Sequence, residues 1–503
     1  MKWLPLMVFA VFGFYLVGNN FQAKLGMIDD HEIAMFLGAD GVIKPTEIPS
    51  VIMSTEVGKW GTYLRYRPSY YSLRVIESAL WRDNATLWYF SRYLMLVFGM
   101  WIGWKIAAIY FPKIVAYIFI FYLMTIPFWS DLLTRLGPSE IYGIIAIPLF
   151  VYGIIRSKLW MIATGYVVAI GAKENFLILF PILLLYVIYR IYKKLITHRE
   201  VVVYGLISLY TLFIVLAIAK ATASAGADIY GASISYSDRF ALLYSYKRYI
   251  VESRHLQLAL MVFTAGTMNL GVMIYQKGLA ILRRNIIVNH LLVALVVGIL
   301  IISQYIFYNS QIPSNIRYDF PVMLLFPILQ MIAVSLAIKL LPPKILGAKI
   351  SLIVYLMVFA GMLSIIVKRG YSPLQQQAQK ITDTTQIFQQ QLSIVETKLL
   401  TDPATSLVFV SEGYLDFEPI VSVSRFLTSR KINNKFILDY HPKEKIKDPM
   451  ILDDRLRDVM KGQVGNDGIF DRFTEYEIDG KPCLSITFGA AASHPTCPEI
   501  ARF

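Results

Sequence analysis

Eleven apolar stretches, each long enough to cross a bilayer, dominate the first 367 residues of the chain. Crossing about 30 Å of hydrocarbon takes about 17 to 25 residues of apolar helix. The stretches cover residues 3–19, 89–107, 113–130, 140–156, 158–173, 175–192, 201–220, 256–276, 286–304, 319–338 and 350–367. Because 56% of the residues are hydrophobic and only 16% are charged, a soluble globular protein is excluded. The sequence predicts a polytopic α-helical membrane protein with about 11 transmembrane helices.

The apolar run from 158 to 192 has two interpretations. The segment "AIGAKENFLILFP" interrupts it, which favours a hairpin of two short spans with Lys173 and Glu174 at the turn. A single long span would instead put the basic residues at its two ends on opposite sides of the membrane. Both interpretations stay open at this point.

Basic residues gather in alternate loops between the stretches. They are Lys105, Lys113, Arg156, Lys158, Arg190, Lys193, Lys194, Arg199, Lys277, Arg283, Arg284, Lys339, Lys344 and Lys349. Since positively charged loops stay in the cytoplasm, we expect these loops and the N-terminus inside and the C-terminus outside. Basic cytoplasmic loops explain most of the net charge of +14, so no nucleic-acid partner is expected.

The extracytoplasmic face receives the long loop 20–88 and the tail 369–503. We therefore expect a transmembrane domain, 1–368, and a small soluble α/β domain, 369–503. In this tail, "SLVFVSEG" and "KFILDYHP" predict buried strands, "EPIVSVSRFLTSR" a helix between them, and "PLQQQAQKITDTTQIFQQQLSIVETKLL" a polar helix. Its two cysteines, Cys483 and Cys497, either pair or remain free thiols.

Four ionisable residues stand side by side in the loop after the first span: Asp29, Asp30, His31 and Glu32. Adjacent carboxylates repel, which raises one pKa unless a cation or a hydrogen-bond donor compensates. Such clusters suit general-base catalysis or divalent-metal binding. The alternative is an acidic turn that caps the helix beginning near "HEIAMFLG", and capping and catalysis do not exclude each other. His31 is either a phosphate or metal contact or a surface residue.

Arginines and tyrosines alternate in "YLRYRPSYYSLRVIESALW" of the same loop, with Arg65, Arg67 and Arg74 as the basic members. Residues 69–81 predict an amphipathic helix with an apolar side. That side consists of Tyr70, Leu73, Ile76, Leu80 and Trp81. Such a helix is typical of the headgroup region, where it either serves the substrate or is an ordinary interfacial helix.

Three further outer loops place charges at the ends of spans. Arg135 and Glu140 belong to "TRLGPSEIYG", Lys173 and Glu174 to "GAKENF", and Arg317 to "IPSNIRYDFP". Guanidinium and ammonium groups bind phosphate, and ionisable groups near membrane depth are functional candidates. The alternatives are helix capping for Glu140, a self-neutralising pair for Lys173 and Glu174, and a snorkelling side chain for Arg317.

These motifs together resemble the GT-C superfamily of glycosyltransferases, which use polyprenyl-phosphate sugars. The superfamily includes protein O-mannosyltransferases, lipid A aminoarabinose transferases and phage-type O-antigen glucosyltransferases. The motifs are "DDHE" at 29–32, "RLGPSE" at 135–140, "KENF" at 173–176 and "RYDFP" at 317–321. The last is similar to an Arg-Tyr-x-x-Pro element common in these families. The resemblance covers the topology of residues 1–367.

The resemblance implies roles for individual residues. Asp29 or Asp30 is expected to be the catalytic base, and Lys173, Arg317 and Arg135 are expected to bind the donor phosphate. The supporting residues are expected to be His31, Glu32, Glu140, Arg65 and Arg67. No cofactor is required; a divalent metal held by Asp29 and Asp30 is the open alternative.

The implied reaction moves a sugar, with inversion, from a polyprenyl-phosphate carrier to a glycan, lipid or protein acceptor. Nucleotide sugars are cytoplasmic, so a site on the outer face of a bacterial inner membrane needs a lipid-linked donor. A lipid-linked glycan polymerase or ligase is one alternative, and it does not need the acidic pair. A transporter or flippase is another, although transporters usually show internal repeats, which are not visible here.

Overall fold

The computed structural model describes residues 3–38, 40–62, 65–224, 295, 320, 346–412, 416–440, 482–489 and 491–503. This part of the chain is mostly helical, with a small sheet near the C-terminus. Five of its helices are long and apolar enough to cross a membrane: Leu4–Gln22, Ala85–Tyr110, Ser139–Arg156, Glu174–Tyr192 and His198–Ala221. The chain is therefore a membrane protein. The expected spans 256–276, 286–304 and 319–338 lie outside the described residues, apart from Leu295 and Phe320.

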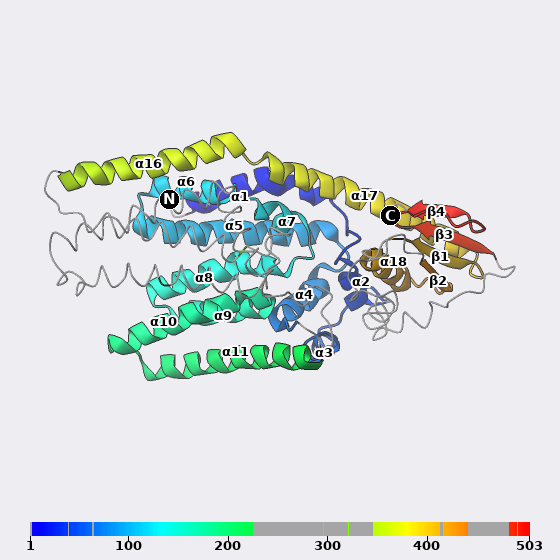
Figure 1. Cartoon of the computed structure of the whole chain (residues 1–503), viewed down its shortest axis with the longest axis horizontal. Helices are drawn as coiled ribbons and strands as arrows, with labels where there is room; N and C mark the ends of the chain where they lie inside the picture. Colours follow the sequence, from blue (N-terminus) through cyan, green and yellow to red (C-terminus); the bar gives the residue numbers. More distant parts are fainter. Residues whose placement is uncertain are drawn as a thin grey trace, which may run out of the picture.

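The helices of the bundle run side by side along the long axis of the molecule (Figure 1). They are α1 (Leu4–Val17), α5 (Ala85–Tyr110), α6 (Lys113–Leu123), α8 (Gly143–Arg156), α9 (Leu159–Ala172), α10 (Leu179–Tyr192), α11 (His198–Ser224) and α16 (Leu346–Arg369). Shorter elements gather at one end of the bundle: η1 (Gly18–Gln22), α2 (His31–Leu37), α3 (Ile48–Ser54), α4 (Pro68–Trp81), α7 (Phe128–Thr134), η2 (Ser139–Tyr142) and η3 (Glu174–Ile178).

Two of the expected apolar runs are not single continuous helices, and a local feature of the backbone explains each interruption. The run 113–130, expected as one span, is bent by 80° between α6 and α7. Pro127, which begins α7, lacks an N–H and keeps the residue before it out of the helical region, so the helix cannot continue through it. The run 158–192 is divided at Lys173, whose backbone is extended between α9 and η3.

The C-terminal sheet consists of four parallel strands in the order β2-β1-β3-β4. The strands are β1 (Ser406–Ser411), β2 (Phe436–Tyr440), β3 (Cys483–Thr487) and β4 (Glu499–Arg502). Helix α18 (Phe417–Ser429) connects β1 to β2, and α17 (Ser372–Thr401) precedes β1, so both strands and both helices expected in the tail are present. Every residue of β1 is buried, as is typical of a central parallel strand.

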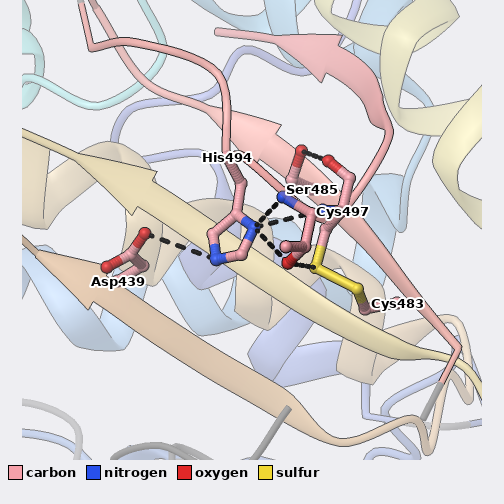
Figure 2. Close-up of a disulfide and its surroundings, with 6 residues drawn as sticks. Asp439, Cys483, Ser485, His494 and Cys497 are labelled. Carbon is pink, nitrogen blue, oxygen red and sulfur yellow. Dashed lines mark hydrogen bonds and ion pairs between the residues drawn. A yellow bond between two sulfur atoms is a disulfide. The ribbon is translucent and has the colours of Figure 1, made fainter. Parts of the chain in front are cut away.

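A disulfide joins Cys483 of β3 to Cys497, so the two cysteines pair. Figure 2 shows the ring of His494 between this disulfide and Asp439. The Nδ1 atom of His494 accepts a hydrogen bond from the Cys497 N–H at 3.1 Å, and its Nε2 atom lies 3.7 Å from a carboxylate oxygen of Asp439. The hydroxyl of Ser485 donates to the Cys497 carbonyl at 3.0 Å. These contacts fix the segment before β4 against the sheet.

One hydrophobic core joins the C-terminal unit to the loop after α1. Ile33 of α2 and Trp88 of α5 belong to the same buried cluster as Leu392 of α17 and Phe426 of α18. Helix α17 extends from the bundle to the sheet along one edge of the molecule, and α2 and α4 lie between them (Figure 1). The acidic motif at the start of α2 is therefore enclosed by the bundle on one side and the C-terminal unit on the other.

Candidate functional site

Asp30 is buried at the start of α2, but it does not cap this helix. It occupies the N-cap position without a side-chain hydrogen bond to the helix, and its Oδ2 atom instead accepts from the Gly26 N–H at 2.7 Å. Its Oδ1 atom lies 3.7 Å from the Arg74 guanidinium. Burial raises the pKa of Asp30 to about 6, although Arg74 and the Gly26 hydrogen bond both favour the charged form. The Asp30 carboxyl therefore closes the turn between Gly26 and Asp30.

Arg74 lies inside the protein and not at the lipid headgroups. Its Nη1 atom donates to the Leu136 carbonyl at 2.8 Å, and its guanidinium lies 4.7 Å from the centre of the Trp88 ring. Helix α4 does form where residues 69–81 were expected. However, Ile76 and Leu80 are exposed on it while Arg74 is fully buried, so the face toward the protein is the charged one. An arginine is stable there because a carboxylate, a carbonyl and an aromatic ring surround it.

Asp29 is the accessible member of the acidic pair. Its backbone is left-handed (φ 69°), a conformation that aspartate tolerates better than most residues. The side chain is 39% exposed, and its Oδ2 atom lies 3.1 Å from Nη2 of Arg135. The Nη1 atom of Arg135 lies 3.3 Å from Asp131. One guanidinium thus connects a carboxylate of the first loop with one from α7, and all three side chains reach solvent.

Glu32 is held by two tyrosines of α4. The Tyr70 hydroxyl donates to it at 2.9 Å and the Tyr71 hydroxyl at 3.4 Å. Burial raises the pKa of Glu32, and the charges of Arg74 and Arg67 act against that rise. Arg67 itself forms a bidentate ion pair with Glu56, with its closer contact at 2.6 Å.

His31 is neutral. Burial lowers its pKa to about 3, and the nearby Arg425 of α18 lowers it further, whereas Asp29 has the opposite effect. A neutral imidazole next to two carboxylates accepts or donates hydrogen bonds without adding charge.

Lys173 lies between two glutamates at the junction of α9, η2 and η3. Its ammonium is 3.6 Å from Glu140 and 3.7 Å from Glu174, and it is almost fully buried. Arg65 and Arg67 both interact electrostatically with Glu174. Lys173 is thus paired with Glu140 as well as Glu174, so the alternative of a self-neutralising pair is extended to a triad.

The described candidates form two groups. The first group consists of Asp29, Asp30 and Glu32 of the first loop with Arg135, and the second consists of Lys173 with Glu140 and Glu174. Arg67 interacts with Glu32 in one group and with Glu174 in the other, so it lies between them. Arg317 lies outside the described residues. Within the described ranges, no three His, Cys, Asp or Glu side chains lie together as metal ligands would.

A third polar cluster, Glu77 with Arg92 and Tyr142, is not predicted from the sequence. Glu77 of α4 receives two hydrogen bonds of 2.9 Å from Arg92 of α5, and the Tyr142 hydroxyl donates to it at 2.5 Å. All three side chains are buried. The sequence does contain a sign of this cluster: Arg92 falls within the apolar stretch 89–107, where an ionisable residue requires a partner. This cluster fixes α4 to the first long helix that follows it.

Comparisons with models of protein families, with curated proteins and with solved structures gave no match to this chain.

Proposed function

We propose that this chain is an inverting glycosyltransferase that moves a sugar from a polyprenyl-phosphate carrier to an acceptor hydroxyl, with Asp29 as its base. The observation that supports this most strongly is the contact between Asp29 and Arg135. It puts a solvent-accessible carboxylate next to a partly exposed cation at one end of the apolar bundle. A base for the acceptor and a positive charge for a leaving phosphate are the two groups that such a transfer needs.

The two aspartates have different roles in this proposal. Asp30 is 3% exposed and already bonded to Gly26 and paired with Arg74, so an acceptor hydroxyl has no direct route to it. Asp29 is exposed and its left-handed backbone directs it toward Arg135 and the second loop. Non-glycine residues in this conformation concentrate at functional sites. Asp29 is therefore the base, and Asp30 is the residue that holds the loop in place.

In the proposed step, the carboxylate of Asp29 takes the proton of the acceptor hydroxyl. The acceptor oxygen bonds to the anomeric carbon from the side opposite the phosphate, and the bond from that carbon to the phosphate oxygen breaks. The lipid phosphate leaves with the bonding electrons, and Arg135 stabilises its charge. Lys173 and Arg317 remain proposed contacts of the donor phosphate; Lys173 is buried between Glu140 and Glu174, so such a contact requires its ammonium to leave these carboxylates.

The proposal puts this site on the extracytoplasmic side of a bacterial inner membrane. The disulfide between Cys483 and Cys497 supports that side for the C-terminal unit, since disulfides persist mainly in oxidising compartments. The acidic motif shares a core with that unit, so both belong on the same side.

The test measures transfer from a synthetic polyprenyl-phosphate sugar by the purified protein, with and without a chelator. Asp29→Asn should lower turnover by about 10²-fold to 10⁴-fold, as the loss of a general base does. Asp40→Asn is the matched control, because Asp40 is another exposed carboxylate of the same loop. Full turnover by Asp29→Asn would reject the base and favour a polymerase or ligase. A loss of turnover with chelator alone would reveal a metal.

A further inference from the structure

The segment that carries the acidic pair has no regular secondary structure of its own. Residues 23–30 lie between the end of η1 and the start of α2. Main-chain groups of such a segment need partners from elsewhere. Helix α17 supplies them: the Thr385 hydroxyl accepts from the Lys24 N–H at 3.0 Å, and the Gln389 side-chain amide donates to the Leu25 carbonyl at 2.7 Å. Both contacts join parts of the chain more than 350 residues apart.

Helix α18 holds the same segment from a second direction. The hydroxyl of Ser422, which is fully buried, donates to the main-chain carbonyl of Met27, two residues before Asp29. One turn further along α18, Arg425 interacts electrostatically with His31, two residues after Asp29. Helix α18 therefore contacts both sides of the proposed base.

The turn at Gly26 is enclosed between these supports. A Cβ atom at this position would lie 3.3 Å from the Asp30 carboxylate and 3.3 Å from the Thr385 methyl group. The Gly26 N–H meanwhile donates to Asp30. A side chain at position 26 would therefore be tightly packed against both the Asp30 carboxylate and α17.

Gln389 also ties the two helices to each other. Its side-chain oxygen accepts from Nη2 of Arg430 at 2.8 Å, and Nη1 of Arg430 pairs with Glu396 at 2.7 Å. A single amide therefore bonds to the acidic segment through its nitrogen and to the end of α18 through its oxygen. These two functions can be separated by substitution.

We propose that Gln389 and Ser422 are positioning residues of the C-terminal unit, which hold the segment 23–30 so that Asp29 meets Arg135. The expected effect on catalysis rests on the proposed function, in which Asp29 is the base. Both residues bond to the main chain that carries Asp29. Their loss should lower kcat and leave the KM for the donor unchanged, because they place the base and do not bind the lipid.

Two variants and two matched controls test this in the full chain. Gln389→Glu keeps an acceptor for Arg430 but removes the donor to Leu25. Ser422→Ala removes the bond to Met27. Ser424→Ala is the control on α18, because Ser424 is equally buried and bonds only within its helix to Val421. Gln379→Ala is the control on α17.

The two readouts are hydrogen exchange of residues 23–30 and the kinetics of transfer from the synthetic polyprenyl-phosphate sugar. Both test variants should exchange this segment about tenfold faster and lose about tenfold in kcat, with KM within about twofold of wild type, whereas the controls should match wild type. Unchanged exchange in both test variants overturns the inference. Faster exchange with unchanged kcat overturns the positioning role. If the wild type transfers no sugar, the proposed function fails, and exchange alone decides whether the helices hold the segment.

Discussion

Replacing Gly137 with alanine tests the position of Asp29 without changing a charge. Gly137 belongs to the "RLGPSE" motif and its carbonyl accepts a hydrogen bond from Tyr70 at 3.3 Å. A Cβ atom added to Gly137 would lie 2.2 Å from both Cβ and Oδ2 of Asp29. Real Cβ atoms essentially never show contacts under 3.0 Å, and the Cβ of Asp29 is fixed to its main chain, so the two main-chain segments must move apart.

The size of the effect follows from these distances. Ordinary contact begins at 3.4 Å, so Asp29 and Gly137 must separate by about 1.2 Å. A shift of this size is enough to break the 3.1 Å contact between Asp29 and Arg135, because such hydrogen bonds vary in length by only about 0.5 Å. A catalytic group misplaced by about 1 Å lowers the rate by about 10²-fold. We therefore expect Gly137→Ala to lower kcat about 100-fold and stability by about 1 to 3 kcal/mol through overpacking.

The assay is transfer from the synthetic polyprenyl-phosphate sugar, with thermal unfolding measured on the same preparations. Gly205→Ala is the matched control, because nothing lies within 4 Å of a Cβ atom at that position. Both variants should fold, and Gly205→Ala should match wild type in kcat. If folded Gly137→Ala turned over within about twofold of the control, the position of Asp29 would not matter and the argument for it as the base would be wrong.

Three further variants test stability. Asp30→Asn should remove a pH dependence: the pKa of Asp30 rises from 3.8 to about 6 on folding, so the wild type loses about 3 kcal/mol of stability as pH rises from about 4 to 6, and the variant does not. At pH 7 this gain is offset in the variant, because buried Arg74 loses its carboxylate. Glu77→Gln should lower stability by about 3 to 5 kcal/mol, because Arg92 is left buried without its carboxylate. Replacing Cys483 and Cys497 by serine should lower it by about 3 kcal/mol, and reductant should lower the wild type to the same value.

Each of these three predictions can be contradicted by a specific result. A stability difference between Asp30→Asn and wild type that is the same at pH 4 and pH 7 would contradict the raised pKa. Glu77→Gln with an unchanged unfolding temperature would mean that Arg92 has another anionic partner. An unfolding temperature insensitive to reductant would mean that the disulfide does not constrain the C-terminal unit.

The sequence predicts elements well where one periodic signal decides them. The apolar runs of α5 and α11, the buried strands β1 and β2 and the helix between them all lie where expected. Each of these depends on burial along a single segment, which composition and period report directly. The sequence does not predict the bend between α6 and α7, because the run stays apolar through it and Pro127, which immediately precedes α7, falls inside the expected span.

The site was predictable in its residue types but not in its pairings. The acidic motif and Arg135 were both identified, and they meet at 3.1 Å. By contrast, Arg74 was assigned to the lipid headgroups, because periodicity gives a helix two faces and assigns charges to the outer one. Its buried partners, Asp30 and the Leu136 carbonyl, come from 44 and 62 positions away in the chain, and no local pattern reports them.

The bonds from α17 to the segment before α2 have a consequence for synthesis. Gln389 is added 364 residues after Leu25. At about 5 to 20 residues per second, about 20 to 70 s pass between the synthesis of Leu25 and the synthesis of Gln389, which binds it. The nascent protein is therefore expected to cross the bilayer several times while its acidic motif is still unfixed. Synthesis of α17 therefore decides when the segment before α2 reaches its final structure.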